Sequence, residues 1–499
     1  MLANLSAALS MMADPAVLVA MIVGTIVGIV VGVLPGLGSV VGITMVLPFT
    51  IAMAQLPSVA LMLGVYCGSV YGGSITAVLI NTPGTPASAA TCFDGYPMAR
   101  RGEADLAIGW VTLASLFGGV FSILILVLAA PQLAAIAVRF GPVEYFALMV
   151  FAMTCIATVS QDSLLKGLLM GMAGLFIGVV GADPVTGDLR FEFGVFALSG
   201  GIGLIPVVVG AFALAEVFHR AGATDPAPAP SAARLGYRVA PWAQWWLRRR
   251  VLLKASMIGA FIGVLPGTGA ATASFISYSE VRRTSPRRDR MGHGEPDGLI
   301  ASEAANNAVT GGALVPTLAL GIPGDPVTAV MLGSLVLQGV TPGPKLFAEN
   351  ASVVYAIFFC LLVVNLLMAG LGLLGARWYG RILRVPEPLL LTAVSILALV
   401  GAYGVNNSMF DVLIALVSGI VMLLLRSAGF AAAPMVIGLV LGPLLEEKLR
   451  QGLIVSDGNF LAFFASPIAS VLFLLTLAFL AKAILPTRRN VPIDPEANP

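Results

Sequence analysis

The chain contains the same unusual pattern twice, each time inside a long apolar segment. Residues 32–38 read Gly-Val-Leu-Pro-Gly-Leu-Gly, and residues 263–269 read Gly-Val-Leu-Pro-Gly-Thr-Gly. Proline and glycine both interrupt an α-helix. In hydrocarbon, an interruption leaves backbone N–H and C=O groups unpaired unless protein or a wet cavity surrounds it. Paired interruptions at matching places in two halves are a strong sequence indication of the binding site of a secondary transporter.

The composition indicates a polytopic α-helical membrane protein. Of 499 residues, 58% are hydrophobic and only 10% are charged, whereas about 25% is typical of soluble proteins. The net charge of +2 gives no indication of nucleic-acid binding. The four cysteines lie in or beside apolar segments and the two histidines near charged loops, so we expect no Cys/His metal cage.

The repeat extends beyond the opening motif. Three more matches follow in the same order in both halves: Tyr71-Gly72-Gly73 with 81–86 against Thr310-Gly311-Gly312 with 321–326, Gln161-Asp162-Ser163 against Asn406-Asn407-Ser408, and 206–210 against 434–438. We therefore predict an all-α fold of two homologous repeats, about 10–14 membrane segments in all. The predicted parts are a first transmembrane repeat (15–218), a cytoplasmic Pro-rich linker with an interfacial segment (219–250), a second transmembrane repeat (251–446), a C-terminal transmembrane helix (447–484) and a cytoplasmic tail (485–499).

The basic loops change places between the two halves. The loop at 52–57 has no charge, while its counterpart at 282–290 holds five arginines. Farther along, the first half has Arg100 and Arg101 where the second has one base, Lys345. Because cytoplasmic loops are enriched in Lys and Arg, this exchange predicts inverted repeats.

The second motif lies between two basic segments that should both be cytoplasmic. Only the 31 residues from 251 to 281 separate Arg248–Arg250 from the arginine-rich loop. Each arm beside the Pro-Gly interruption is then about 15 residues, shorter than the ~20 that span a bilayer. We predict a re-entrant helical hairpin with 265–269 at its tip; a pair of short, tilted spans is the alternative.

Broken helices expose main-chain dipoles that bind ions. A helix N-terminus attracts carboxylates through free N–H groups and a partial positive charge, while unwound carbonyl groups suit Na⁺. The chain has four candidate breaks, at 34–38, 82–86, 265–269 and 322–326. The predicted substrate-binding residues lie at or near the second and fourth: Ser74, Asn81, Thr82, Pro83, Gly84, Thr85, Asn306, Asn307, Gly321, Pro323, Gly324 and Asp325. The predicted cation-coupling residues are Gly36, Gly38, Gly267, Thr268, Gly269 and Asp325.

Asp325 stands out because it lies within an apolar run between two prolines. An ionisable group at membrane depth is a functional candidate. The alternative is that Asp325 caps the helix that begins at Pro326, and the two roles can coexist. Asn306 and Asn307, with Glu303 just before them, either line the cavity or make interhelical hydrogen bonds.

Long runs of the chain resemble the TctA family, the large membrane subunit of the tripartite tricarboxylate transporters. In the first half the runs are 32–38, Gly72-Gly73 and 81–84. In the second half they are 263–275, Tyr278-Ser279-Glu280, 294–298, 301–308, 311–326 and 338–344. The resemblance covers nearly the whole chain except the linker and the tail.

The resemblance implies a location in the bacterial inner membrane and two partners. These are a small membrane subunit (TctB-like) and a periplasmic solute-binding protein (TctC-like) that delivers the substrate. The imported solute would be a small carboxylate, a tricarboxylate or related organic acid, driven by a Na⁺ or H⁺ gradient. The sequence contains no GxxxxGK[ST] phosphate loop, in keeping with transport without ATP. We expect no cofactor other than the coupling ion, and no enzymatic activity.

Three other functions remain as alternatives: a passive channel, an exporter or flippase, and an intramembrane aspartyl protease that uses Asp325 with Asp162 or Asp411. Proteolysis needs two carboxyl groups close enough to share a proton, and it gives no reason for the doubled Pro-Gly breaks. The sequence leaves open which carboxylate and which ion are carried, the oligomeric state, and whether the movement is rocking or an elevator.

Overall fold

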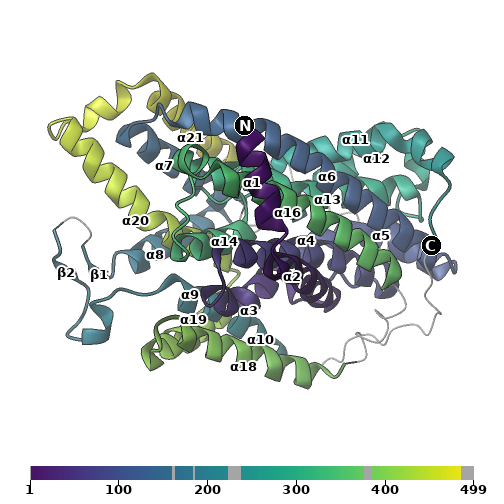
Figure 1. Ribbon diagram of the computed structural model, residues 1–499, viewed down its shortest axis with the longest axis horizontal. Helices are drawn as coiled ribbons and strands as arrows, with labels where there is room; N and C mark the ends of the chain where they lie inside the picture. Colours follow the sequence, from purple (N-terminus) through teal and green to yellow (C-terminus); the bar gives the residue numbers. More distant parts are fainter. Residues whose placement is uncertain (1, 160–162, 184–185, 223–237, 376–384, 485–499) are drawn as a thin grey trace.

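The computed structural model describes residues 2–159, 163–183, 186–222, 238–375 and 385–484 (Figure 1). In this part of the chain nearly all regular structure is helical, apart from a hairpin of β1 (Gly181–Ala182) and β2 (Leu189–Arg190). Seven helices among the described residues are long and apolar enough to cross a membrane, and five shorter apolar helices accompany them. The predicted all-α polytopic membrane fold is confirmed.

The helices of the first half are α1 (Leu2–Met12), α2 (Pro15–Val33), α3 (Gly38–Ile51), α4 (Gln55–Ile80), η1 (Pro86–Ser88), α5 (Ala89–Arg100), α6 (Ala104–Ala137), α7 (Pro142–Val159), α8 (Leu164–Gly178), η2 (Phe196–Leu198), α9 (Leu204–Val208), the π-helical turn η3 (Val209–Leu214) and α10 (Ala215–Ala221). Those of the second half are α11 (Trp242–Val264), α12 (Gly269–Thr284), η4 (Arg288–Arg290), α13 (Pro296–Leu320), α14 (Pro326–Leu337), α15 (Pro344–Glu349), α16 (Ala351–Leu374), α18 (Glu387–Asn406), α19 (Met409–Ser427), α20 (Ala432–Val455), η5 (Phe460–Phe464) and α21 (Pro467–Ile484).

The doubled motif folds into the same tight turn twice, once between α2 and α3 and once between α11 and α12. Gly36 and Gly38 have φ angles of 80° and 71°, and Gly267 and Gly269 have φ angles of 80° and 68°. Only glycine adopts this left-handed region without a steric penalty. The glycines of the motif are therefore required by the turn itself.

The α11–α12 pair is the predicted helical hairpin. Its arms lie side by side, and Lys254 Nζ of α11 donates to Glu280 Oε1 of α12 at 2.6 Å. Arg283 and Lys254 together lower the pKa of the Glu280 carboxyl to about 2. Arg101, which follows α5, donates to the carbonyl oxygens of His293 and Gly294. The basic residues at both ends of the hairpin thus share one end of the molecule, which the predicted re-entrant hairpin and the alternative pair of short spans both require.

Two long helices, α4 and α13, end at the other predicted breaks. Asn81 ends α4 and Gly321 ends α13, both in the left-handed conformation. After each end the chain doubles back along the helix: Gly84 N donates to Gly73 O at 3.1 Å, and Gly324 N donates to the hydroxyl of Thr317 at 3.3 Å.

A new helix then begins in each half with the same capping box. In the first half Thr85 and Ser88 begin η1 and α5. In the second half Asp325 and Thr328 begin α14. The interruptions at 82–86 and 322–326 are therefore helix–turn–helix breaks of one kind, as the repeat predicts.

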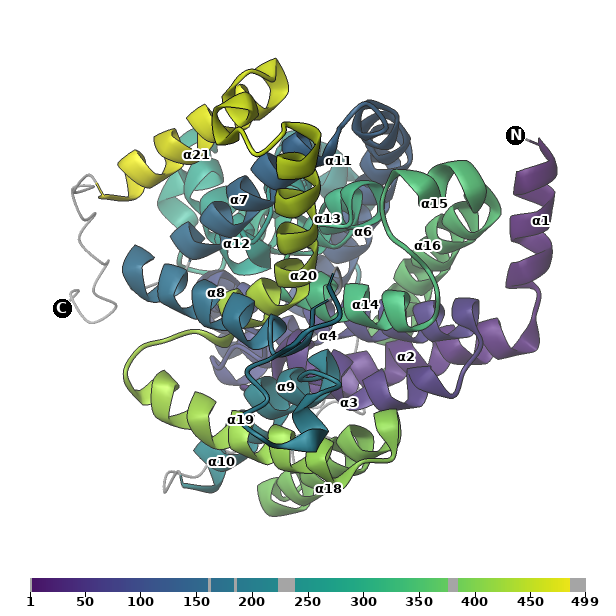
Figure 2. The same ribbon diagram turned by 90° about the vertical axis from the view of Figure 1, so that its left-hand side faces the viewer.

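The two halves exchange partners across the molecule. The hairpin helix α3 packs along α14 of the other half, where Thr50 Oγ1 and Ser334 Oγ are 3.0 Å apart. Its counterpart α12 packs along η1 and α5, where the rings of Phe93 and Tyr278 are 5.3 Å apart. Two homologous halves related by a two-fold axis, as inverted repeats are, pair reciprocally in this way. Figures 1 and 2 show the peripheral pair α18 and α19 along the lower edge and α21 at the top.

Glycines at every fourth position let α2 and α4 approach closely. The series are Gly24, Gly28 and Gly32 on α2, and Gly64, Gly68 and Gly72 on α4. A Cβ atom added at Gly28 would lie 2.6 Å from the Val65 carbonyl oxygen. Small residues in this spacing drive helix packing in membranes, where apolar burial gives little driving force.

Some helices cross the predicted boundaries of the two repeats. Helix α11 begins at Trp242, before residue 251, and α20 continues past residue 446 to Val455. Most of the predicted linker (223–237) and the predicted tail (485–499) lie outside the described residues. The division into the five predicted parts stays a prediction.

Candidate functional site

All four breaks contribute to one cavity of about 570 Å³. Its walls include residues 36–41 and 85–87 from the first half and residues 267–272 and 325–327 from the second. Residues of α4, α8, η3, α10, α19 and α20 complete it. Segments far apart in the sequence thus meet at one place because the two halves interlock.

Six helices begin at this cavity. The tips of the two hairpins supply the N-termini of α3 and α12, and the other two breaks supply those of η1 and α14. The first residues of α8 and α20 also lie at its wall. Each α-helix N-terminus carries free N–H groups and about half a positive charge, so their convergence favours an anion in the cavity.

The hairpin helices differ from the helices after α4 and α13 in their caps. Neither Leu37 at the start of α3 nor Thr268 at the start of α12 accepts a hydrogen bond from its helix through a side chain. Thr268 instead donates its hydroxyl to the carbonyl oxygens of Ile262 and Leu265. The first N–H groups of α3 and α12 therefore face the cavity without a side-chain partner.

Asp325 takes both of the positions that the sequence suggested for it: it caps a helix, and it lines the cavity. Its Oδ1 accepts hydrogen bonds from the backbone N–H and the hydroxyl of Thr328, at 2.7 and 2.8 Å. Its Oδ2 accepts a 2.5 Å hydrogen bond from Tyr66 of α4. The side chain, 3% exposed, thus joins the two halves at the cavity wall.

Three charged side chains at the cavity were not predicted from the sequence. They are Lys166 of α8, Glu216 of α10 and Arg426 of α19. Lys166 Nζ donates to the Ala428 carbonyl oxygen at 2.7 Å, and Arg426 pairs with Glu216 at 2.5 Å. The only signal in the sequence was a lone base beside each of two apolar runs, at residues 166 and 426.

The predicted site residues fall into two groups. Those that line the cavity are Gly36, Gly38, Thr85, Gly267, Thr268, Gly269 and Asp325. Those placed elsewhere are Ser74, Asn81, Thr82, Pro83, Gly84, Asn306, Asn307, Gly321, Pro323 and Gly324. Within the second group, Gly324 is required by the shape of its break, because a Cβ atom there would lie 2.5 Å from Ala313 Cα. The roles of both groups in binding stay predictions.

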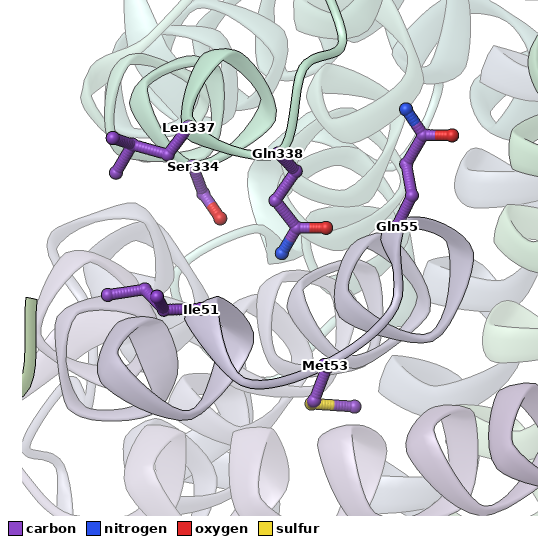
Figure 3. A pocket seen from close by; sticks show the side chains of 6 residues that line it. All are labelled: Ile51, Met53, Gln55, Ser334, Leu337 and Gln338. Carbon is purple, nitrogen blue, oxygen red and sulfur yellow. The ribbon is translucent and has the colours of Figure 1, made fainter.

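A smaller pocket of about 160 Å³ lies at the far ends of α3 and α14 (Figure 3). It is lined by Ile51, Met53, Gln55, Ser334, Leu337 and Gln338. Gln338 Nε2 donates to the Thr50 carbonyl oxygen at 2.5 Å, which ties the two helices together beside it. None of its lining residues belongs to a break or carries a charge, so we do not assign the site here.

The carboxyl groups of the protease alternative have separate partners. Asp325 accepts from Tyr66, and Asp411 Oδ2 accepts from Asn406 Nδ2 at 2.8 Å. Asp162 lies outside the described residues. The described residues therefore show no pair of aspartates that share a proton.

Comparison with known proteins gives the chain a family. Residues 18–437 match the tripartite tricarboxylate transporter TctA family. The "Uncharacterized 52.8 kDa protein in TAR-I ttuC' 3'region" of Agrobacterium vitis is 38% identical over 463 residues, 91% of each chain. The "Uncharacterized protein in TAR-II ttuC' 3'region" of the same organism is 40% identical over 232 residues, which are 46% of this chain and 96% of that protein. No solved structure matches the chain.

The family match includes every break and every residue that lines the cavity. The match thus spans both of the interlocked halves that build the cavity. The chain belongs to the tripartite tricarboxylate transporter TctA family, as a multi-pass membrane component in the inner membrane.

Proposed function

We propose that this chain binds a small organic carboxylate in the 570 Å³ cavity and carries it inward, driven by a Na⁺ or H⁺ gradient. A periplasmic binding protein would deliver the solute, and a small membrane subunit would stand beside the chain. The observation that carries the proposal is the convergence of six helix N-termini, from both halves, on a cavity that also holds Lys166 and Arg426.

The cavity has the size that a small polycarboxylate requires, and its two positive side chains, Lys166 and Arg426, are balanced by Glu216 and Asp325, so the free N–H donors favour the anion. Ligand pockets for small molecules have volumes of about 300–1,000 Å³. Lys166 and Arg426 supply formal positive charge, and the uncapped starts of α3 and α12 supply free N–H donors. Hydrogen bonds from such donors to a carboxylate are about twice as strong as neutral ones.

The helix caps favour a different assignment of the substrate and the cation to the four breaks from the one predicted from sequence. That prediction gave the substrate to 82–86 and 322–326 and the cation to 34–38 and 265–269. Since Asp325 and Thr85 already occupy the capping positions of their helices, we propose that the tips of the two hairpins bind the substrate carboxylates. Asp325 would repel an anion in the same cavity, and a bound cation or proton would remove that repulsion.

The decisive experiment is uptake by the three subunits reconstituted in liposomes. Candidate carboxylates are offered with Na⁺ and pH gradients imposed separately, with and without the binding protein. We expect accumulation that depends on one of the gradients and on the binding protein. Flux that is independent of both the ion gradients and the binding protein would show a passive channel instead.

Two variants test the cavity itself. Lys166→Gln and Arg426→Gln each remove one charge-assisted hydrogen bond, a loss of about 1.5–3 kcal/mol, so the KM for the carboxylate should rise about ten-fold or more. Lys448→Gln is the matched control, because Lys448 pairs with Glu447 near the end of α20 and does not line the cavity. An unchanged KM in both cavity variants would place the substrate elsewhere.

A further inference from the structure

Glu303 is a buried carboxyl group in α13 that the cavity does not include. Its side chain is 0% exposed, and it lies two turns from the start of the helix at Pro296. No ion pair among the described residues contains it. A carboxylate without a positive partner at membrane depth is costly, so this position needs either a proton or a dense set of donors.

Hydroxyl groups of two neighbouring helices donate to the carboxyl. Thr91 of α5 donates to Glu303 Oε1, and Ser115 of α6 donates to Oε2 at 3.2 Å. Ser302 of α13 is the second hydrogen-bond partner of Thr91, at 3.2 Å. These donors stabilise the ionised form of Glu303 without neutralising its charge.

Three buried oxygen atoms nearby lack a hydrogen bond. Ser74 Oγ, Asn306 Oδ1 and Asn307 Oδ1 belong to side chains that are 0% exposed, and none of these atoms has a partner. The Ser74 hydroxyl and the Asn306 amide lie within reach of the Glu303 carboxyl and can donate to its ionised form. After rotation of the hydroxyl or a flip of the amide, the same side chains can accept a hydrogen bond from the protonated form. A buried acceptor without a donor costs about 1–3 kcal/mol.

A proton on Glu303 would supply the missing donor. The protonated carboxyl has one O–H group to give to Asn306 or Ser74, and its carbonyl oxygen still accepts from Thr91 or Ser115. The site thus has partners for both forms of the carboxyl, which is the requirement for a group that binds and releases a proton.

Polar groups connect Glu303 with the cavity on one side. Asn306 Nδ2 points to the carbonyl oxygen of Val70, a residue of the cavity wall, at 3.5 Å. Thr85, also in the wall, is hydrogen-bonded to Ser88, one turn before Thr91.

On its other side, Glu303 faces the basic end of the molecule. Asp94, one turn after Thr91, accepts hydrogen bonds from the backbone N–H groups of Gly292, Gly294 and Glu295. These residues belong to the loop that Arg101 also binds. Glu303 therefore lies between the cavity and the end of the molecule that the basic loops mark as cytoplasmic.

We propose that Glu303 carries the coupling proton, an inference that rests on the proposed carboxylate import. With the substrate bound, a proton from the cavity joins a Glu303 oxygen and forms one O–H bond. After the conformational change the same bond breaks, the proton passes to water on the cytoplasmic side, and the carboxylate returns to its hydroxyl donors. One proton enters and one leaves, with no other reactant.

No positively charged side chain among the groups near Glu303 neutralises its carboxylate, so a proton is the charge that can do so. These groups are Cys92 and Asp94 of α5, Tyr278 of α12, Tyr71 of α4 and Asp297 of α13 itself. None of them carries a positive charge. The nearest arginine in α11, Arg248, is paired with Glu295 and Asp297 instead.

The first test uses Glu303→Gln in liposomes that contain all three subunits. The glutamine amide donates to Asn306 as a protonated carboxyl would, but it cannot release a proton. We expect accumulation driven by a pH gradient to fall at least ten-fold, while exchange of labelled for unlabelled carboxylate across the membrane persists. Glu103→Gln is the matched control: this glutamate forms a surface ion pair with Arg101 and should leave both activities unchanged.

Wild-type accumulation in Glu303→Gln would overturn the proposal, as would the loss of exchange together with accumulation, because a structural role predicts that joint loss. Accumulation that a Na⁺ gradient alone drives in the wild type would overturn it too. Glu303→Asp is the second variant, since it keeps a titratable carboxyl but withdraws it from Thr91 and Ser115. It should retain accumulation with a shifted pH profile.

A second measurement does not depend on transport. Infrared spectra of the purified chain, taken as wild type minus Glu303→Gln, should show the C=O stretching band of one protonated carboxyl that disappears as the pH rises. The absence of that band at every pH would overturn the proton assignment even if import is confirmed. If no carboxylate is transported by any variant, the proposed function fails, and the spectrum still decides the protonation of Glu303.

Discussion

At the scale of single residues, Asp325 holds three connections at once: the start of α14, the hydroxyl of Tyr66 in the other half, and the cavity wall. Its charge and its cap can be separated, because asparagine caps a helix about as well as aspartate does. Asp325→Asn should therefore assemble with nearly wild-type stability and lose ion-coupled uptake. Asp325→Ala should lose uptake and also about 2–4 kcal/mol of stability, because it removes the cap and leaves the buried Tyr66 hydroxyl without its acceptor.

Uptake and thermal unfolding in detergent measure the two effects. Ser408→Ala is the control for the cap alone, since Ser408 caps α19 through Phe410 N and does not line the cavity. It should lower stability by about 1 kcal/mol and leave uptake intact. If Asp325→Asn transports like the wild type, the Asp325 charge has no part in coupling.

The site residues that the sequence could predict are those that the backbone conformation requires. Gly36, Gly38, Gly267 and Gly269 carry a turn that only glycine makes easily, and that requirement shows in the sequence as a repeated motif. Lys166 and Arg426 are different because their partners, Ala428 and Glu216, lie 262 and 210 residues away. No local pattern records such pairs, so they became visible only once the halves were folded together.

At the scale of elements, the α2–α4 contact is the most demanding, because backbone meets backbone along Gly24, Gly28 and Gly32. We expect Gly28→Ala to lower the stability of the protein by about 1–3 kcal/mol, the usual range for an overpacked contact, since its Cβ would press on the backbone of Val65. Gly370→Ala is the matched control, because Gly370 lies in α16 with nothing within 4 Å of its added Cβ.

The control should change stability in the other direction. Alanine in an open helical position raises stability by about 0.4–1 kcal/mol, chiefly by restricting the unfolded chain. Thermal unfolding of the two variants in the same detergent makes the comparison. Equal shifts for Gly28→Ala and Gly370→Ala would mean that the close approach of α2 to α4 is not required.

At the scale of the whole molecule, the sequence predicted the inverted halves from the exchanged positions of the basic loops, and the pairing of α3 with α14 and of α12 with α5 agrees with it. What it could not predict is which surfaces of the halves meet. A sequence repeat indicates that the two halves fold alike. How the halves dock depends on contacts between distant side chains, such as Thr50 and Ser334, which no local sequence pattern indicates.

Because the halves dock in this way, a pair of helices, one from each half, forms the wall on each side of the cavity. Both α3 and α14 begin at the cavity and end together at Thr50 and Ser334, near the smaller pocket. On the other side α12 and η1–α5 begin at the cavity and run towards the arginine-rich end. In alternating access one wall opens while the other stays closed, so a covalent bond across either wall should stop transport.

The two hydroxyl oxygens 3.0 Å apart at Thr50 and Ser334 give the position for such a bond, since two cysteines there could reach disulfide geometry. In a chain whose four native cysteines are replaced by alanine, we expect the Thr50→Cys, Ser334→Cys double variant to lose uptake on oxidation and to recover it on reduction. Each single variant, treated in the same way, should keep its activity, because one cysteine cannot bridge the wall. Mass spectrometry of the peptides establishes whether the bond has formed. Full uptake with the bond in place would mean that α3 and α14 move as one body, and that the entrance must open elsewhere.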